Sequence, residues 1–382
     1  MSAIVEQPRQ AVEVDLRRTE EDPRLAAVAR PTALIAHRKG ELLVARNINL
    51  AARSLGASVL AANDESFGEK ENLIIDAPAD FTPGGYGHKG EIVDGWETRR
   101  RGPGRDWVLV RLGSPGVISS VDVDTSFFTG NYPECCVVEA CAVAGYPAPE
   151  ELLAPAVGWE TIVASSRLDG DAHNVFAVES GRRFTHVRLT IAPDGGVARL
   201  RVGGRVCLDP GEVDGLTVDL AARALGGVVE ASSDEFYSSA DVLNLPDLPR
   251  SMGEGWETRR RRGPGNDWAL IRLAAAGRIR VVEVDTSWFK YNASSEVALL
   301  GARASTTPAV DSPAWQQLLP RTRLQPDTRH RFRIDSDRAD EEVTHVRFDA
   351  FPDGGVARLR LCGEVSADGL RELGAELRAA RG

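Results

Sequence analysis

The feature that most constrains the fold of this 382-residue chain is an internal repeat. The string "GWETRRRGPGRDW" at 95–107 returns with little change as "GWETRRRRGPGNDW" at 255–268. Four further blocks recur in the same order: "LAARSLGA" at 50–57 with "LAARALGG" at 220–227, "DVDTSFFTGN" at 122–131 with "EVDTSWFKYN" at 283–292, "THVR" at 185–188 with 344–347, and "PDGGVARLR" at 193–201 with 352–360. The chain is therefore a tandem duplication of a unit of roughly 150–170 residues, which is too long for a solenoid repeat.

Within each copy, most segments have the pattern of β-strands. The runs "DWVLVRL" at 106–112 and "DWALIRL" at 267–273 are short and largely apolar, and "VISSVDVDTS" at 117–126 alternates apolar with polar residues. Glycine, proline and aspartate turns separate these runs. Many short antiparallel strands in a unit of this size predict an all-β fold, with one jelly-roll β-sandwich for each copy.

Helix is predicted at two places only. The segment "TVDLAARALGG" at 217–227 opens the second copy, with Thr217 or Asp219 as its cap. A C-terminal helix from Ser366 places Leu370, Leu373 and Leu377 on one face. The predicted organisation is a flexible tail at 1–30, a first jelly-roll at 31–205, a linker at 206–216, a second jelly-roll at 217–365 and a C-terminal helix at 366–382.

The first copy is longer than the second near the repeated tryptophan. It carries about ten extra residues within 74–94, where the second copy has only "NLPDLPRSMGE", and such an insertion suits a lid or a subunit contact as well as neutral decoration.

Composition excludes several classes of protein. The net charge of −10 argues against a general nucleic-acid binder, and the chain has no apolar stretch long enough to span a membrane. The N-terminal "MSAIVEQPRQ" lacks the apolar core of a signal peptide. The five cysteines have no C-x-x-C spacing, which predicts a reducing cytoplasmic location without a disulfide framework or a structural zinc site.

The repeated blocks also carry ionisable groups that suit a site. A sandwich places strand-end and loop residues at its rims, where arginines can clamp an anion and carboxylates or histidines can move protons. The candidates for acid/base chemistry are Glu97, Glu257, Asp124, Asp285, His186 and His345. The candidates for substrate binding are Arg99, Arg259, Trp96, Trp256, Thr98, Thr258, Asp64, Glu65, Asp234 and Glu235.

Each motif has a structural interpretation beside the functional one. Tryptophans often pack in a core or at a rim, and Asp-Thr-Ser at a strand end is often a turn that bonds its own backbone. The Pro-Asp-Gly-Gly turn lacks the strand-to-helix setting of a phosphate cradle, and one histidine per copy is often a satisfied strand residue. The arginine run at 99–101 is flanked by acids and has no aromatic ladder, so it is not read as a nucleic-acid patch.

Several blocks together resemble one enzyme family. The duplicated "GWETRRRRGPGNDW", the segment "VDTSWFKYN", the opening "LAARALGG…SSDEFY" and the closing "HVRFDAFPDGGVARLRLCGEV" are similar to allantoicase, the allantoate amidinohydrolase of purine catabolism. The resemblance runs from about Asn47 to Val365. It implies two jelly-roll domains per subunit, of the galactose-binding type, in a homo-oligomeric enzyme that hydrolyses allantoate to ureidoglycolate and urea.

The first copy departs from this pattern. Ser66 stands where the second copy has Phe236, and Phe127 stands where it has Trp288. Thr129-Gly130 replaces Lys290-Tyr291. If only one copy is catalytic, these differences mark the asymmetry.

The chemistry of the implied reaction agrees with the residue types. Expelling a ureido group needs a proton for a poor nitrogen leaving group, a water activated by a carboxylate, and an arginine for the substrate carboxylate. Direct water attack and expulsion of urea followed by hydration both remain open. No tight spacing such as H-E-x-x-H occurs, so we expect no obligatory tightly bound metal, with a divalent ion such as manganese as the alternative.

Three rival functions remain at this point. A tandem jelly-roll can bind a sugar or a small anion without turnover, and a structural scaffold would also explain the duplication. Among enzymes, a neighbouring ureido or guanidino hydrolase is the nearest alternative to allantoate hydrolysis.

Overall fold

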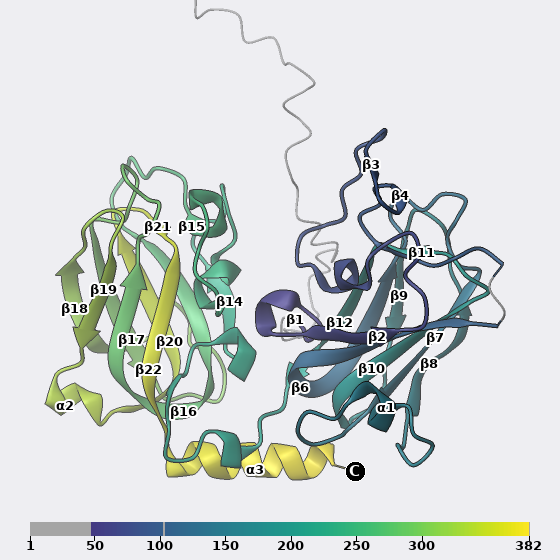
Figure 1. The fold of residues 1–382 in the computed structure, drawn as a ribbon. Helices are drawn as coiled ribbons and strands as arrows, with labels where there is room; N and C mark the ends of the chain where they lie inside the picture. Colours follow the sequence, from purple (N-terminus) through teal and green to yellow (C-terminus); the bar gives the residue numbers. More distant parts are fainter. Residues whose placement is uncertain (1–46, 102–103, 382) are drawn as a thin grey trace, which may run out of the picture. The chain divides into compact units, whose positions relative to one another are not determined.

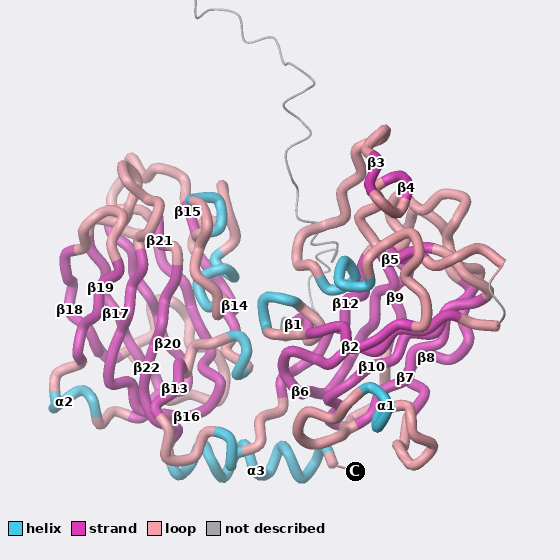
Figure 2. The backbone as a smooth tube through the Cα atoms, in the orientation of Figure 1, coloured by secondary structure: helices cyan, strands magenta, loops and turns pink. Residues whose placement is uncertain are grey.

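The computed structural model of the protein describes residues 47–101 and 104–381. The predicted tail at 1–30 and the beginning of the first predicted domain lie outside the described residues. Figures 1 and 2 show that strands dominate both copies, and that helices are confined to short turns and to one longer C-terminal helix. The all-β tandem fold predicted from the sequence is confirmed.

The first repeat is a two-layered sandwich, and its longest strand takes part in both layers. The first half of β6 (Asp106–Asp124) pairs with β2 (Ser58–Ala62) and β10 (Arg183–Ala192). Its second half pairs with β12 (Arg199–Val206) and β9 (His173–Ala177). The remaining strands of the sheet are β1 (Ile48–Asn49), β7 (Cys135–Cys141) and β8 (Glu160–Arg167), in the order β1-β12-β6-β10-β7-β8.

One apolar core fills the space between the two layers of the first repeat. Alternate residues of β6 and its neighbours point inward and are almost completely buried, as expected for strands with one core-facing side. Among these residues are Val108, Val110, Val121, Val123, Val187, Leu189, Leu200 and Val202.

The second repeat has the same topology. Its long strand β16 (Asp267–Asp285) pairs with β14 (Val228–Ser232) and β20 (Glu342–Phe351) in its first half, and with β22 (Arg358–Val365) and β19 (Arg329–Arg333) in its second. The sheet order β13-β22-β16-β20-β17-β18 matches that of the first repeat strand for strand, and it includes β13 (Thr217–Asp219), β17 (Glu296–Ala302) and β18 (Gln316–Arg323).

The helices of the described chain are short apart from one. The C-terminal helix α3 (Ala367–Ala380) begins where Ser366 accepts a hydrogen bond from the Gly369 amide, and it buries Leu373 and Leu377. The other helical elements are η2 (Arg53–Leu55), η3 (Lys70–Ile74), α1 (Pro149–Leu152), η4 (Pro210–Glu212), η5 (Arg223–Leu225), η6 (Ala240–Asn244), η7 (Met252–Glu254) and α2 (Ser336–Ala339). Among the described residues, no helix combines the length and apolar character that a membrane crossing requires.

The segment at 217–227 differs from the helix expected there. Its first residues form β13, and only Arg223–Leu225 form a single turn of 3₁₀ helix. The Asp219 side chain accepts hydrogen bonds from the amides of Ala221 and Leu361, so it ties the chain to β22 instead of capping a helix. Pairing with the sheet therefore outweighs the local helix propensity.

In each repeat, one buried arginine holds the loops beneath the rim. Arg199 is 1% exposed, and its guanidinium binds backbone carbonyls of Ala77 and Asp94 and the Asp94 carboxylate. Arg358 makes the equivalent contacts with Asp247 and Glu254 in the second repeat. The arginine of the repeated "GGVAR" block is therefore a structural residue, and the extra segment of the first repeat is anchored by it.

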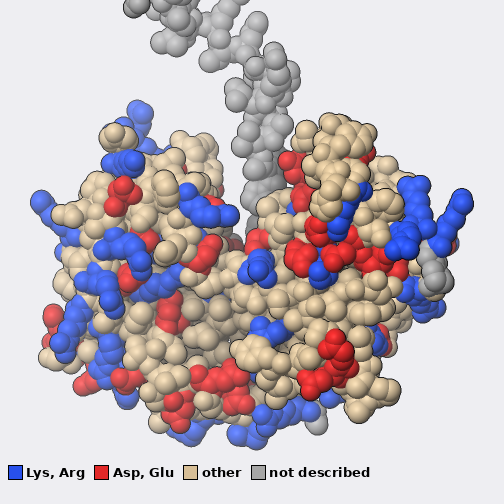
Figure 3. Space-filling model, viewed as in Figure 1, with Lys and Arg blue, Asp and Glu red and all other residues tan. Residues whose placement is uncertain are grey.

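The extra segment of the first repeat ends in a small hairpin. Strands β3 (Tyr86–Gly87) and β4 (Gly90–Glu91) pair with each other, and Tyr86 is exposed. Surface charge is mixed in sign: Figure 3 shows acidic and basic side chains interspersed over the visible face.

Candidate active site

The repeated Trp-Glu pair forms a short strand at one rim of each sandwich. In the first repeat β5 (Trp96–Glu97) pairs with β11 (Gly196–Val197), which places Glu97 opposite Gly196. A Cβ atom at Gly196 would overlap the ring of Phe128, so only glycine allows this close approach. In the second repeat β15 (Trp256–Glu257) and β21 (Gly355–Val356) pair in the same way.

Glu97 is one of the residues that line a rim cavity of about 300 Å³. It is 8% exposed, and its Oε1 accepts a 2.7 Å hydrogen bond from Asn131 Nδ2. Burial raises the pKa of the Glu97 carboxyl, although the Asn131 hydrogen bond and the Arg100 charge act in the opposite direction. Glu97 therefore keeps its proton to a higher pH than an ordinary glutamic acid.

The other walls of this rim cavity are polar and charged. Arg100 and Arg101 are both exposed, and the Arg101 amide donates to the Asp194 carboxylate at 2.8 Å. Further lining comes from Tyr132 and Glu134. A carboxyl group with a raised pKa, two guanidinium groups and an exposed carboxylate therefore surround one small space.

The second repeat keeps the hydrogen bond between asparagine and glutamate and differs at neighbouring positions. Asn292 Nδ2 donates to Glu257 Oε1 at 2.6 Å, but the same amide also contacts the sulfur of Met252 at 3.4 Å. By the repeat offset, Ala293 and Ser295 stand at the positions of Tyr132 and Glu134. The second copy therefore lacks the counterpart of the exposed carboxylate and of the phenol.

Asp64 and Arg99 lie together next to the rim cavity. The Asp64 carboxylate accepts from the Arg99 amide at 2.8 Å and pairs with the Arg99 guanidinium at 3.3 Å. The Ser66 hydroxyl also donates to Asp64. Arg99 does not line the rim cavity, and its neighbours Arg100 and Arg101 do. The arginine run therefore reaches the cavity, but the sequence did not show which of its members faces it.

The equivalent aspartate and arginine of the second repeat make different contacts. Asp234 accepts from the Arg259 amide at 2.8 Å, while the Arg259 guanidinium stacks over Phe236 at 4.3 Å. The difference between Ser66 and Phe236 thus changes the partner of the arginine. Each of the two arginines therefore has a local partner, the Asp64 carboxylate for Arg99 and the Phe236 ring for Arg259.

The tryptophans and threonines predicted to bind substrate are structural. Trp96 and Trp256 are completely buried, and their indole N–H groups donate to the backbone carbonyls of Asp64 and Asp234. Thr98 and Thr258 are also buried, and each hydroxyl accepts from the amide of the facing glycine, Gly195 or Gly354. The structure places these four residues in buried positions, with their polar groups bonded to the backbone of their own repeat.

Glu65 and Glu235, which follow Asp64 and Asp234 in the sequence, are bonded within their own loops. Glu65 pairs with Lys70 at 3.1 Å, and Glu235 accepts from the hydroxyls of Ser232 and Ser239. Both carboxylates fix their own loop, so the structure does not support them as substrate ligands.

Asp124 and Asp285 form the turns that the structural interpretation of Asp-Thr-Ser anticipated. Each is buried, and each accepts a 2.8 Å hydrogen bond from the amide two residues later, Ser126 or Ser287. Asp285 also borders a separate cavity of about 280 Å³ with Trp288 and others. Neither aspartate lines the rim cavity with Glu97.

The histidines lie far from the rim along their strands. His186 is opposite Arg111 in β6, six residues before the end of β10, which corresponds to about 20 Å at about 3.3 Å per residue. Burial lowers the pKa of His186 and of His345 to about 4, and a neighbouring arginine charge adds to the effect. The structure therefore does not bring these histidines together with the glutamates, because both lie in the middle of their strands.

The described residues contain one group of carboxylates close enough to share a metal ion. It consists of Glu65, Glu69 and Glu71. Lys70 Nζ pairs with Glu65 at 3.1 Å and Glu71 at 3.0 Å, and Lys89 Nζ pairs with Glu69 at 3.0 Å. These ammonium groups already neutralise the cluster, so its residues do not fit a divalent cation.

Comparison with known proteins identifies the family. A family model described as "Allantoicase repeat" matches residues 48–207 and again 218–366. The chain belongs to the allantoicase family. The predicted linker at 206–216 overlaps the interval between the two matched segments.

Relatives of the allantoicase family match across most of their length. A protein of Streptomyces coelicolor named "Probable allantoicase" is 46% identical over 351 residues, which cover 89% of this chain and 91% of that protein. One of Nocardia farcinica with the same name is 50% identical over 319 residues, covering 83% and 94%. The crystal structure of allantoicase from Saccharomyces cerevisiae superposes with a TM-score of 0.69 at 31% identity, covering 84% of this chain and 95% of that one.

Proposed function

We propose that this protein hydrolyses allantoate to ureidoglycolate and urea, and that the reaction takes place in the rim cavity of the first repeat. Membership of the allantoicase family supports the reaction. The observation that supports the place is the buried Glu97, with its raised pKa, beside two exposed arginines in a cavity of about 300 Å³.

Each part of the substrate has a counterpart in this cavity. Allantoate is a carboxylate whose α-carbon carries two ureido groups, so it needs an anion clamp and a proton donor. The guanidinium groups of Arg100 and Arg101 suit bidentate binding of the carboxylate. Glu97 supplies the proton for the departing ureido nitrogen, because its burial favours the protonated acid.

Glu134 completes the reaction as the base. Its exposed carboxylate accepts a proton from water as the water oxygen bonds to the α-carbon. The bond from that carbon to the ureido nitrogen breaks, and the nitrogen takes its proton from Glu97 and leaves as urea. The products are ureidoglycolate and urea, with Glu97 ionised and Glu134 protonated until the solvent exchanges both protons.

Two matched variants test the proposal. Glu97→Gln keeps the side-chain shape and removes the acid, so urea release from allantoate should fall by about 10²–10⁴-fold. Glu257→Gln makes the same change in the second repeat and should leave most of the turnover. Near-normal turnover in Glu97→Gln, or equal losses in both variants, would reject the first-repeat site. A binding module without turnover would release no urea from the unmodified protein.

We further propose that catalysis needs no tightly bound metal and that the protein acts as a cytoplasmic homo-oligomer. The lysine-neutralised cluster at Glu65, Glu69 and Glu71 supports the first point. The five cysteines are all free thiols, which suits a reducing compartment. Light scattering of the purified protein would measure the oligomeric state.

A further inference from the structure

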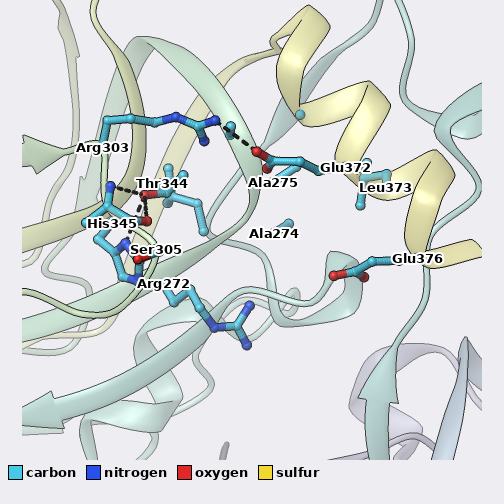
Figure 4. A pocket seen from close by; sticks show the side chains of 14 residues that line it. Arg272, Ala274, Ala275, Arg303, Ser305, Thr344, His345, Glu372, Leu373 and Glu376 are labelled. Atoms are coloured by element: carbon cyan, nitrogen blue, oxygen red, sulfur yellow. Dashed lines mark hydrogen bonds and ion pairs between the residues drawn. The ribbon is translucent and has the colours of Figure 1, made fainter.

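The arginines that line two other cavities of the described chain already have acidic partners. Figure 4 shows the cavity of about 550 Å³ beside helix α3, where Arg303 pairs with Glu372 at 2.9 Å. In the cavity of about 280 Å³, Arg329 pairs with Glu283 at 2.6 Å. The guanidinium of Arg101 differs, because it lines the rim cavity and makes no ion pair or hydrogen bond within the described residues. The rim cavity therefore offers an arginine that is not paired with an acid.

Arg261 stands at the position of Arg101 in the second repeat. The backbone amide of Arg101 donates to the Asp194 carboxylate at 2.8 Å. The backbone amide of Arg261 donates to the Asp353 carboxylate at 2.6 Å. Both aspartates belong to the repeated Pro-Asp-Gly-Gly turn, so the two arginines are anchored at equivalent points of their rims.

The side chains of these two arginines go to different partners. The Arg261 guanidinium binds the carboxylate of Asp267, which is 1% exposed. Asp106 is the counterpart of Asp267, and it accepts a 2.8 Å hydrogen bond from the side-chain amide of Asn63. Within the described residues, Asp106 has no ion pair with an arginine. The same arginine and aspartate are thus joined in the second repeat and separate in the first.

The lengths of the two loops account for this difference. Four residues separate Arg101 from Asp106, whereas five separate Arg261 from Asp267. Arg101 has a φ of 60°, in the left-handed region that residues with a side chain rarely adopt, and Arg261 is not among the described residues with a positive φ. Such a backbone persists only where its surroundings fix it, and it is enriched at functional positions.

We propose that the shorter loop makes Arg101 the residue that determines specificity for a carboxylate-bearing substrate. The loop keeps the Arg101 guanidinium away from Asp106 and in the rim cavity, where its planar fork can bind a carboxylate through two parallel hydrogen bonds. In the second repeat the longer loop lets Arg261 neutralise Asp267 instead. This role rests on the proposed function, because the carboxylate in question is that of allantoate.

A loop exchange tests the proposal without a change in net charge. Replacing the eight residues 99–106 by the nine residues of 259–267 adds one residue and keeps four arginines and one aspartate. The longer loop should let Arg101 pair with Asp106, so KM for allantoate should rise by about tenfold or more while kcat stays within about twofold. Adding Asp106→Asn to the exchanged loop removes the competing carboxylate and should return KM to within about twofold of the original value.

A matched pair of point variants separates substrate binding from a structural role. Arg101→Gln should raise KM by about tenfold or more and leave the urea midpoint of unfolding unchanged, because the Arg101 guanidinium has no partner to lose. Arg261→Gln should leave KM within about twofold and lower the urea midpoint, because it deprives the buried Asp267 of its charge partner.

The outcomes distinguish this proposal from the proposed function. Unchanged KM in both Arg101→Gln and the loop exchange, or an equal increase in KM in Arg261→Gln, would overturn the role of Arg101. If Glu97→Gln abolishes turnover while Arg101→Gln keeps its KM, the rim site stands and only the role of Arg101 is lost. If Glu97→Gln retains turnover, the rim site itself is rejected.

Discussion

Asn131 holds Glu97 by a 2.7 Å hydrogen bond from its amide nitrogen to the carboxyl Oε1, and Asn292 holds Glu257 in the same way at 2.6 Å. The donor favours the ionised form of the carboxyl, whereas burial favours the protonated form. In Glu97 the effect of burial is the larger one, so the asparagine limits a shift that would otherwise be greater.

Replacing this asparagine should move the pH profile of the reaction. Asn131→Ala removes the donor, so the pKa of Glu97 should rise further and the alkaline limb of kcat/KM should move to higher pH. Rates of urea release measured from about pH 5 to about pH 10 would show this shift of the alkaline limb. Asn292→Ala is the control and should leave the profile in place; an unmoved limb in Asn131→Ala would contradict the role of Glu97 as the acid.

The arginine that interacts with Glu97 should govern substrate binding. Arg100→Ala removes a charge-assisted contact with the substrate carboxylate, so KM for allantoate should increase by about tenfold or more. Arg260→Ala makes the same change at the equivalent position of the second repeat and should alter KM by less than about twofold. Equal KM values in the Arg100 variant and the unmodified enzyme would place the anion clamp elsewhere.

The buried histidines should make the folded state sensitive to acid. Both have a folded-state pKa of about 4 against a reference value of 6.5, so the unfolded chain binds more protons between these limits. The free energy of unfolding should therefore fall as pH decreases from about 6.5 to 4, by about 3 kcal/mol for each histidine.

Urea denaturation at several pH values would test this stability effect. His186→Gln cannot take up the proton, so its free energy of unfolding should fall less steeply between pH 6.5 and 4 than that of the unmodified protein. An identical slope would show that the histidine titrates normally in the folded state.

Chelation should leave catalysis intact. The carboxylate cluster at Glu65, Glu69 and Glu71 is paired with two lysines, so we expect urea release to continue at an unchanged rate after EDTA treatment and gel filtration. Manganese added to the treated enzyme should have no effect. Activity that is lost with EDTA and restored by manganese would establish a metal site that the described residues do not reveal.

The sequence predicted the architecture well for two reasons. The repeat is visible as matching strings in the two halves of the chain, and the alternation of a strand is a local pattern. Asp124 was an acid/base candidate with a turn as its structural interpretation, and the structure shows that turn, in which Asp124 accepts from the Ser126 amide. The site was only partly predictable. Glu97 lines the rim cavity, but the sequence could not show that Arg100 and not Arg99 faces the same cavity, because that depends on the course of a loop.

The histidines show a second limit of sequence reasoning. Repetition in both copies made His186 and His345 look like members of one site with the glutamates. Position along a strand decides which end of the sandwich a side chain reaches, and β10 carries His186 far from the rim. The tryptophans follow their structural interpretation, because an indole in a charged string can still be completely buried, as Trp96 is.

The two glycines that lie against phenylalanine rings limit which residue each copy can accept. Gly196 faces Phe128 and Gly355 faces Phe289, with no room for even a methyl group in either copy. Packing alone therefore requires glycine at this position in both repeats, whatever reaction either repeat carries out. A division of labour between the repeats is to be sought where their residues differ, as at Glu134 and Ser295.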